Sequence, residues 1–141
     1  MSGFLLDTNV ISEIVKLRPH SRVLQWIENT DEFLLYLSVL TIGELRKGIG
    51  MLPQGQRRGS LEAWLDHDLT LRFSSRILPV DIAVANRWGR ISGTEAARKF
   101  PLPVIDGLLA ATALQHSLTL VSRDTSHAAV TGVDILDPWA Q

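Results

Sequence analysis

The sequence contains no cysteine and no long uninterrupted apolar stretch. The absence of cysteine excludes disulfide bonds and zinc sites built on thiolates. No apolar run approaches the roughly 20 residues that a membrane-spanning helix needs, and the N-terminus has no basic segment followed by a long apolar one. We therefore expect a soluble cytoplasmic protein that carries no targeting segment and does not associate with a membrane.

The chain also carries little net charge, with a formal value of -1 at pH 7. This balance excludes the overall cationic field that marks passive nucleic-acid-binding proteins, so any contact with a polyanion must be local. The length of 141 residues favours a single domain spanning 1–141. A chain of this size buries a core of ordinary dimensions without disulfides.

Short apolar runs alternate with helical patterns along the chain, which predicts an α/β fold. Strands are expected at 4–6, 33–40, 76–80 and 118–121, and a last apolar run lies at 133–136. The helical patterns include two short helices broken at Pro19 and a strong helix over 104–116. Segment 93–103 is interpreted as an irregular connector because glycine and prolines punctuate it.

Acidic side chains follow three of the expected strands. Asp7 ends the first strand, Glu44 lies one helical turn after the second, and Asp124 follows strand 118–121. Since parallel strands end at the same edge of a sheet, we expect these three carboxylates to converge there. Asp106, in the first turn of the helix that begins near 104, joins them only if connector 93–103 returns to that edge. The sequence leaves this open.

Each of these acids also has a purely structural explanation. A carboxylate such as Asp7 can cap the helix that follows it. Thr41 and Glu44 have the spacing of a capping box. An anion in the first turn of a helix, such as Asp106, is stabilised by the helix dipole by roughly 0.3–1 kcal/mol even without a function. The argument for a functional site therefore depends on the whole set.

Converging carboxylates repel and raise one another's pKa unless a cation is present. The candidate ligands are oxygen donors, which select Mg²⁺ or Mn²⁺ over zinc. His116 and His127 stand alone, without the spaced partners of a zinc site, so we assign them no chemistry. The prediction is a magnesium or manganese site at the carboxyl edge of the sheet.

Four segments resemble, in order and in spacing, the PIN-domain toxins of the VapC/FitB type, and the resemblance covers essentially the whole chain. They are LDTNVISE at 6–13, LSVLTIGELRKG at 37–48, IDGLLAATA at 105–113 and LVSRDT at 120–125. The resemblance implies a PIN-like three-layer α/β/α sandwich around a central parallel sheet. It also implies a Mg²⁺- or Mn²⁺-dependent endoribonuclease that serves as the toxin of a type II toxin–antitoxin system.

The resemblance further implies roles for individual residues. Asp7, Glu44 and Asp106 match the family's core acids, as metal ligands and catalytic residues. Asp124 matches the fourth, more variable acid, and Asn9 matches a polar residue that supports the site. One departure is the Ser-His-Ala sequence at 126–128, where members of this family often carry Asp-Phe.

The partners implied by the resemblance are an RNA substrate and a cognate antitoxin whose tail enters the active-site groove. Members of the family commonly form homodimers, and a larger toxin–antitoxin assembly on operator DNA is the corresponding expectation here. The expected reaction is hydrolysis of an RNA phosphodiester bond by a metal-activated water, which leaves a 5′-phosphate and a 3′-hydroxyl.

Two alternatives stay open. One is a different Mg-dependent phosphoryl hydrolase, such as a haloacid-dehalogenase-like phosphatase. That class needs a second aspartate two residues after the first, where this chain has Asn9. The other alternative is a non-catalytic, partner-binding subunit of an antitoxin's DNA-binding repressor complex. Against it stands the intact set of four acids.

Overall fold

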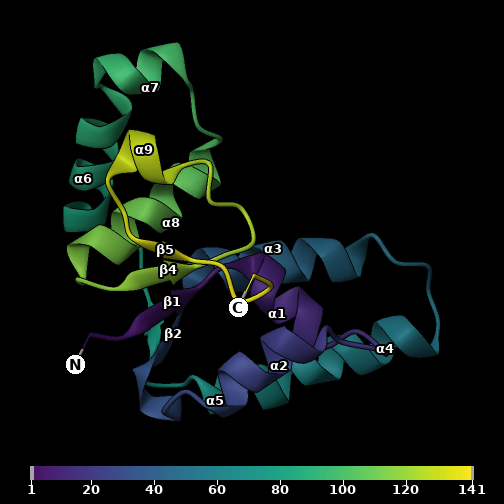
Figure 1. Ribbon diagram of the computed structural model, residues 1–141. Helices are drawn as coiled ribbons and strands as arrows, with labels where there is room; N and C mark the ends of the chain where they lie inside the picture. The colour runs from purple at the N-terminus through teal and green to yellow at the C-terminus, as the bar shows by residue number, and fades with distance from the viewer. Residues whose placement is uncertain (1, 141) are drawn as a thin grey trace.

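A five-stranded sheet with every strand parallel forms the centre of the computed structural model, which describes residues 2–140 (Figure 1). The strands are β1 (Phe4–Leu6), β2 (Leu35–Ser38), β3 (Ile77–Leu78), β4 (Thr119–Val121) and β5 (Ile135–Leu136). Their order across the sheet is β3-β2-β1-β4-β5, so the first strand lies in the middle. All strands therefore end at one edge, as the sequence predicted.

Helices cover both faces of this sheet. They are α1 (Thr8–Ile14), α2 (Ser21–Glu28), α3 (Val39–Gly50), α4 (Gln56–Ala63), α5 (Thr70–Arg72), α6 (Ile82–Ser92), α7 (Glu95–Lys99), α8 (Val104–Gln115) and α9 (Ala128–Thr131). Figure 1 shows α1, α2, α4 and α5 on one side of the strands and α6 to α9 on the other. This arrangement confirms the expected α/β/α sandwich. Within residues 2–140, no helix combines the length and apolar character needed to cross a membrane.

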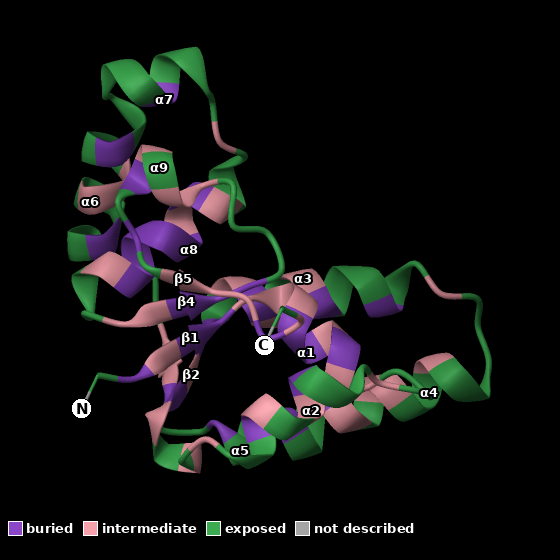
Figure 2. Ribbon diagram, in the orientation of Figure 1, coloured by how far each residue is buried: buried purple, intermediate pink, exposed green. Residues whose placement is uncertain are grey.

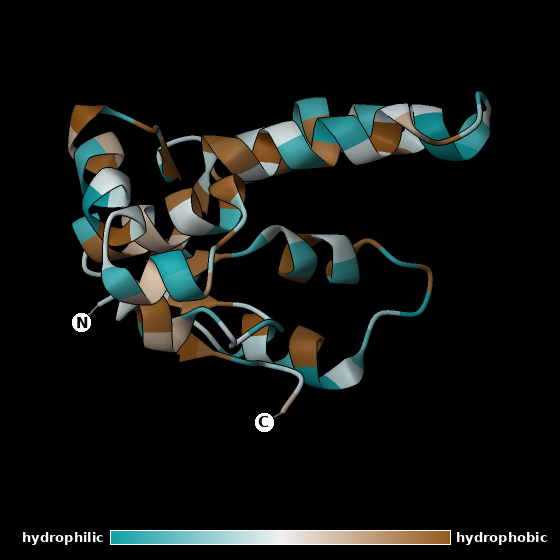
Figure 3. Ribbon diagram, turned by 90° about the horizontal axis from the view of Figure 1, so that it is seen from above, coloured by the Kyte–Doolittle hydropathy of each residue, from teal (hydrophilic) through white to brown (hydrophobic). Residues whose placement is uncertain are grey.

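The central strand contributes to a separate core on each face. Leu5 packs in one cluster with Leu109 and Ala113 of α8, whereas Leu6 packs in the other with Val10 and Ile11 of α1. Neighbouring side chains of a strand point to opposite faces, so β1 is buried on both. Figure 2 shows this burial along the strands, and Figure 3 shows apolar and polar residues alternating around the outer helices, as expected for helices with one buried face.

The second strand is shorter than the expected 33–40. A 3₁₀ turn occupies Glu32–Leu34, and α3 begins at Val39. The cap of α3 is Ser38, whose hydroxyl accepts a hydrogen bond of 3.0 Å from the backbone N–H of Leu40. Apolar residues in the first turn of α3 therefore looked like a continuation of the strand.

The capping-box interpretation of Thr41 and Glu44 is wrong for the same reason. Because Ser38 caps α3, Thr41 lies inside the helix and is completely buried. Glu44 has no capping duty and is available to the site described below.

Segment 93–103 is more regular than the expected connector. It contains the short helix α7, whose N-cap Thr94 accepts a hydrogen bond of 3.1 Å from the N–H of Ala97. After α7 the chain passes two prolines and enters α8 directly behind Pro103. This path returns α8 to the carboxyl edge of the sheet, which decides the position of Asp106.

Candidate active site

Asp7 lies at the junction of β1 and α1, and both of its carboxylate oxygens are hydrogen-bonded. Oδ1 accepts a bond of 2.7 Å from the N–H of Thr8, and Oδ2 accepts one of 2.7 Å from the hydroxyl of Ser122. Asp7 is the N-cap of α1. Capping therefore accounts for one oxygen of Asp7, while the second is held by Ser122, which is distant in the sequence.

Burial and two neighbouring acids act on the pKa of Asp7. Burial raises this pKa above its ordinary value, hydrogen bonds from Ser122 and Thr8 act in the opposite direction, and the charges of Asp106 and Glu44 raise it further. Charge effects of this kind weaken with distance and with screening by solvent, so the three carboxylates share one neighbourhood. The structure thus brings together Asp7 and Glu44, as predicted, and adds Asp106, whose place the sequence left open.

Glu44 projects from α3 toward the start of α1. Its Oε1 accepts a hydrogen bond of 2.6 Å from the hydroxyl of Thr8, which also lies 3.3 Å from the hydroxyl of Thr41. Thr8 therefore contacts two of the acids, Asp7 through its backbone and Glu44 through its side chain. These bonds fix the relative position of the two carboxylates.

Asp124 lies on the loop after β4. Its Oδ1 accepts hydrogen bonds of 2.9 Å from the N–H of Ser126 and of 2.6 Å from the Ser126 hydroxyl. These bonds lower the pKa of Asp124, and His127 lowers it further. Asp124 is consequently an ionised, oriented carboxylate on the more exposed side of the site.

His127 connects this fourth acid to the others. Its Nε2 lies 3.1 Å from Oδ2 of Asp124 and 3.4 Å from Oδ2 of Asp106. His127, to which the sequence assigned no chemistry, therefore lies between two of the acids. Asp106 precedes it by most of α8 and by β4, so no spacing pattern in the sequence could have shown this contact.

Ser122 is the second site residue that sequence analysis missed. It is 1% exposed, and its hydroxyl accepts hydrogen bonds from Asn9 Nδ2 at 3.2 Å and from the N–H of Asp124 at 3.1 Å. With its bond to Asp7, it joins three of the expected site residues. The only signal in the sequence is a small hydroxyl residue directly after a buried strand.

Two unsatisfied atoms mark the same place. Among residues 2–140, the buried side-chain nitrogen and oxygen atoms without a hydrogen-bond partner are Asn9 Oδ1 and His127 Nε2. Buried polar atoms ordinarily find a partner. Asn9 Oδ1, an oxygen acceptor beside a group of carboxylates, fits a site for a hydrated cation, whereas His127 Nε2 already faces Asp124 and Asp106.

The side chains do not by themselves form a closed metal cage. No three histidine, aspartate or glutamate side chains within residues 2–140 surround a common metal position. An ion bound here would take part of its coordination shell from water. Mg²⁺ commonly does so, because it gives up its waters reluctantly.

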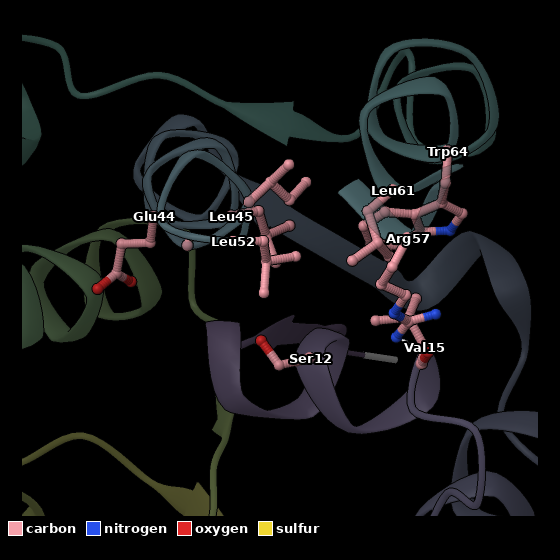
Figure 4. A pocket seen from close by; sticks show the side chains of 10 residues that line it. Ser12, Val15, Glu44, Leu45, Leu52, Arg57, Leu61 and Trp64 are labelled. Carbon is pink, nitrogen blue, oxygen red and sulfur yellow. Dashed lines mark hydrogen bonds between the residues drawn. The ribbon is translucent and has the colours of Figure 1, made fainter. Parts of the chain in front are cut away.

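A groove leads away from Glu44 between α1, α3 and α4. It has a volume of about 220 Å³, and its walls are mainly apolar, with Leu45, Leu61 and Trp64 among the lining residues. Figure 4 shows Glu44 at one end of this groove and Arg57 at the other. Arg57 donates a hydrogen bond of 3.1 Å to the carbonyl of Val15.

Comparisons with known proteins agree with this architecture. The PIN domain family model matches residues 4–133. Toxin FitB of Neisseria gonorrhoeae is 38% identical over 135 residues, covering 96% of this chain and 97% of that protein. VapC ribonuclease Y4jK of Sinorhizobium fredii is 36% identical over 135 residues, covering 96% of both. The solved structure of FitAB bound to an IR36 DNA fragment matches with a TM-score of 0.88 at 36% identity, covering 96% of this chain and 95% of that one.

Proposed function

This chain belongs to the PIN-domain family and is of the VapC/FitB type, and from this premise we propose that it is a metal-dependent endoribonuclease. In this proposal it acts on RNA in the cytoplasm as the toxin of a toxin–antitoxin pair, with 1–141 forming one domain. The observation that carries the proposal is that Thr8 holds Glu44 next to Asp7, and that the charges of Asp106 and Glu44 both act on Asp7 in addition to its burial. The names of the two relatives, a toxin and a VapC ribonuclease, support it.

The proposed metal ligands are Asp7, Glu44 and Asp106, with Asp124 completing the shell through water. A divalent cation, Mg²⁺ or Mn²⁺, supplies the acidification of a water molecule and the neutralisation of charge on the scissile phosphate. The oxygen-rich donor set supports these two metals.

The protein's own contribution is to hold the acids in place before RNA arrives. Ser122 and Thr8 fix the two oxygens of Asp7, and Thr8 also fixes Glu44. His127 lies against both Asp106 and Asp124. Groups oriented in advance need no reorganisation during the reaction, which is the main source of electrostatic catalysis.

The decisive experiment is cleavage of total and synthetic RNA by the purified protein with Mg²⁺, Mn²⁺ or EDTA, beside the Asp106→Asn variant. We expect cleavage that requires the metal, disappears in the variant, and leaves a 5′-phosphate. A cyclic phosphate at the cut end would overturn metal-water hydrolysis, because that product requires attack by the RNA 2′-hydroxyl.

The same assay separates the alternatives. Hydrolysis of a phosphomonoester such as p-nitrophenyl phosphate, without RNA cleavage, would favour a different phosphoryl hydrolase. Absence of both activities, together with no Mn²⁺ binding by calorimetry, would favour the non-catalytic partner-binding subunit.

We also propose that the groove between α1, α3 and α4 receives a segment of the cognate antitoxin. Its apolar walls suit the apolar face of a peptide helix, and Glu44 at its end suits a cationic side chain. The FitAB structure with a DNA fragment supports a larger assembly on operator DNA, and the family resemblance supports a homodimer.

The antitoxin proposal is tested by co-purifying the antitoxin with the Leu61→Asp variant. Leu61 lines the groove, and its apolar side chain forms no hydrogen bond or ion pair with the four acids. We expect the variant to lose the antitoxin and to keep its RNA cleavage. Retention of the antitoxin at wild-type affinity would place its binding site elsewhere.

A further inference from the structure

We propose that a second pocket, between α9 and the connector that joins α7 to α8, binds a nucleobase of the RNA next to the cleaved bond. This inference rests on the proposed ribonuclease function. The pocket, here called the base pocket, has a volume of about 510 Å³ and is lined in part by Lys99, Phe100, Leu102, Ser126, His127 and Val130.

Two of these lining residues connect the base pocket to the acids. His127 lies 3.1 Å from Oδ2 of Asp124 and 3.4 Å from Oδ2 of Asp106. Ser126 donates two hydrogen bonds to the other oxygen of Asp124. A nucleotide whose phosphate lies at the acids therefore has a neighbouring base beside this pocket.

Phe100 supplies an aromatic surface. It is 67% exposed and lies between the end of α7 and the first of the two prolines. A side chain so exposed contributes little to the core. An exposed phenyl ring stacks with any base, because every base has a π face.

Lys99 supplies a positive charge at the base pocket. Its Nζ lies 3.5 Å from Oε1 of Glu95, but the two side chains are 67% and 76% exposed. Exposed ion pairs of this kind contribute little free energy, so Lys99 can exchange Glu95 for a phosphate at small cost. Arg98, also exposed, adds a second cation on α7. An aromatic ring close to cations is the combination that proteins use to bind the bases and phosphates of a single strand.

The test is the affinity for a short single-stranded RNA that carries the fluorescent base 2-aminopurine. Binding is measured in the Asp7→Asn background, so that the RNA is not cut, and Phe100→Ala is compared with Phe33→Ala. Phe33 is a matched control because it is 76% exposed but precedes β2, at the edge of the sheet opposite the acids. Loss of one stacked base should raise Kd roughly 5- to 150-fold in Phe100→Ala and abolish the quenching of 2-aminopurine. Phe33→Ala should bind normally, and Phe100→Trp should restore binding.

Equal Kd values for Phe100→Ala and Phe33→Ala would overturn the base pocket. So would a change in sedimentation mass confined to Phe100→Ala, because Phe100 would then lie between copies of this chain. Thermal melting of each variant shows that it is folded. If the wild type cleaves RNA but binding does not depend on Phe100, the ribonuclease proposal stands and the base pocket is wrong. If binding depends on Phe100 but no RNA is cleaved, only the base pocket stands. If the protein neither binds nor cleaves RNA, both proposals are overturned.

Discussion

The hydroxyl of Ser122 donates a hydrogen bond of 2.7 Å to Oδ2 of Asp7, across the junction between β4 and β1. The same hydroxyl accepts bonds from Asn9 and from the backbone of Asp124. One buried oxygen thus fixes the first acid and the loop that carries the fourth. This relationship depends on the pairing of two central strands and not on any local motif.

Ser122→Ala should lower kcat/KM for RNA about tenfold while leaving the protein folded. The substitution leaves Oδ2 of Asp7 without its partner, and an unsatisfied buried acceptor costs about 1–3 kcal/mol. Because the Ser122 bond lowers the pKa of Asp7, its removal should also raise that pKa and move the acidic limb of the pH–rate profile to higher pH. Initial rates at several pH values check both effects. An unchanged profile with a normal rate would show that Ser122 does not orient Asp7.

Asp7→Asn should abolish cleavage and, in the absence of divalent cations, stabilise the protein at neutral pH. The folded-state pKa of Asp7 is raised, so its favourable contribution to stability is present below the unfolded value near 3.8 and is lost as the pH rises through the folded pKa. Asparagine keeps the N-cap of α1, avoids the cost of burying an ionised carboxylate, and removes the repulsion from Asp106 and Glu44. Each kcal/mol gained corresponds to about 3 °C in Tm for a chain of this size.

Calorimetric melting in EDTA at pH 7 tests whether Asp7→Asn has a higher Tm than the wild type, and added Mn²⁺ provides the control. Mn²⁺ should raise the Tm of the wild type, because it binds only the folded state, and should have little effect on Asp7→Asn. A variant that melts below the wild type in EDTA would contradict the prediction.

The sheet and the acid edge could be predicted because both depend on local patterns. Short apolar runs, and an acid after three of them, are visible in the sequence, and the parallel arrangement then brings Asp7 and Glu44 together. The boundary between β2 and α3 could not be predicted from the sequence, since Val39 and Leu40 suit a strand as well as a helix. The position of Asp106 depended on the path of segment 93–103, which the sequence did not show. His127 and Ser122 could not be predicted because they contact site residues that are distant in the chain.

Glu13→Gln should destabilise the fold without acting on the site. Glu13 is 6% exposed, and its two oxygens accept hydrogen bonds of 2.9 Å from Lys16 and 3.0 Å from the N–H of His20. The bond from Lys16 is the main reason that the pKa of Glu13 lies below its ordinary value. Glu13 therefore contributes stability above the unfolded pKa near 4.5, and this contribution is lost as the pH falls through the lower, folded pKa.

We expect a loss of about 1–3 kcal/mol in Glu13→Gln at pH 7, measured by urea denaturation, and a smaller difference from the wild type below pH 4.5. Glu28→Gln is the control, because Glu28 is exposed on α2. A difference between Glu13→Gln and the wild type that grows on acidification would mean that Glu13 is not the group that titrates.

Two glycine substitutions should change stability in opposite directions. A Cβ on Gly3 would lie 2.7 Å from the carbonyl oxygen of Leu34 and 2.9 Å from Cε1 of Tyr36, whereas one on Gly89 would meet nothing within 4 Å. The carbonyl of Gly3 also accepts a hydrogen bond of 3.1 Å from the N–H of Thr119, so a shift there disturbs the central strand pairing. Gly3→Ala should cost about 1–3 kcal/mol through overpacking. Gly89→Ala, in the exposed middle of α6, should gain roughly 0.5–1 kcal/mol from reduced backbone entropy in the unfolded chain. Urea denaturation of both variants measures these changes in the free energy of unfolding. Losses of equal size in the two variants would mean that the close approach of Leu34 and Tyr36 to Gly3 does not cause the destabilisation.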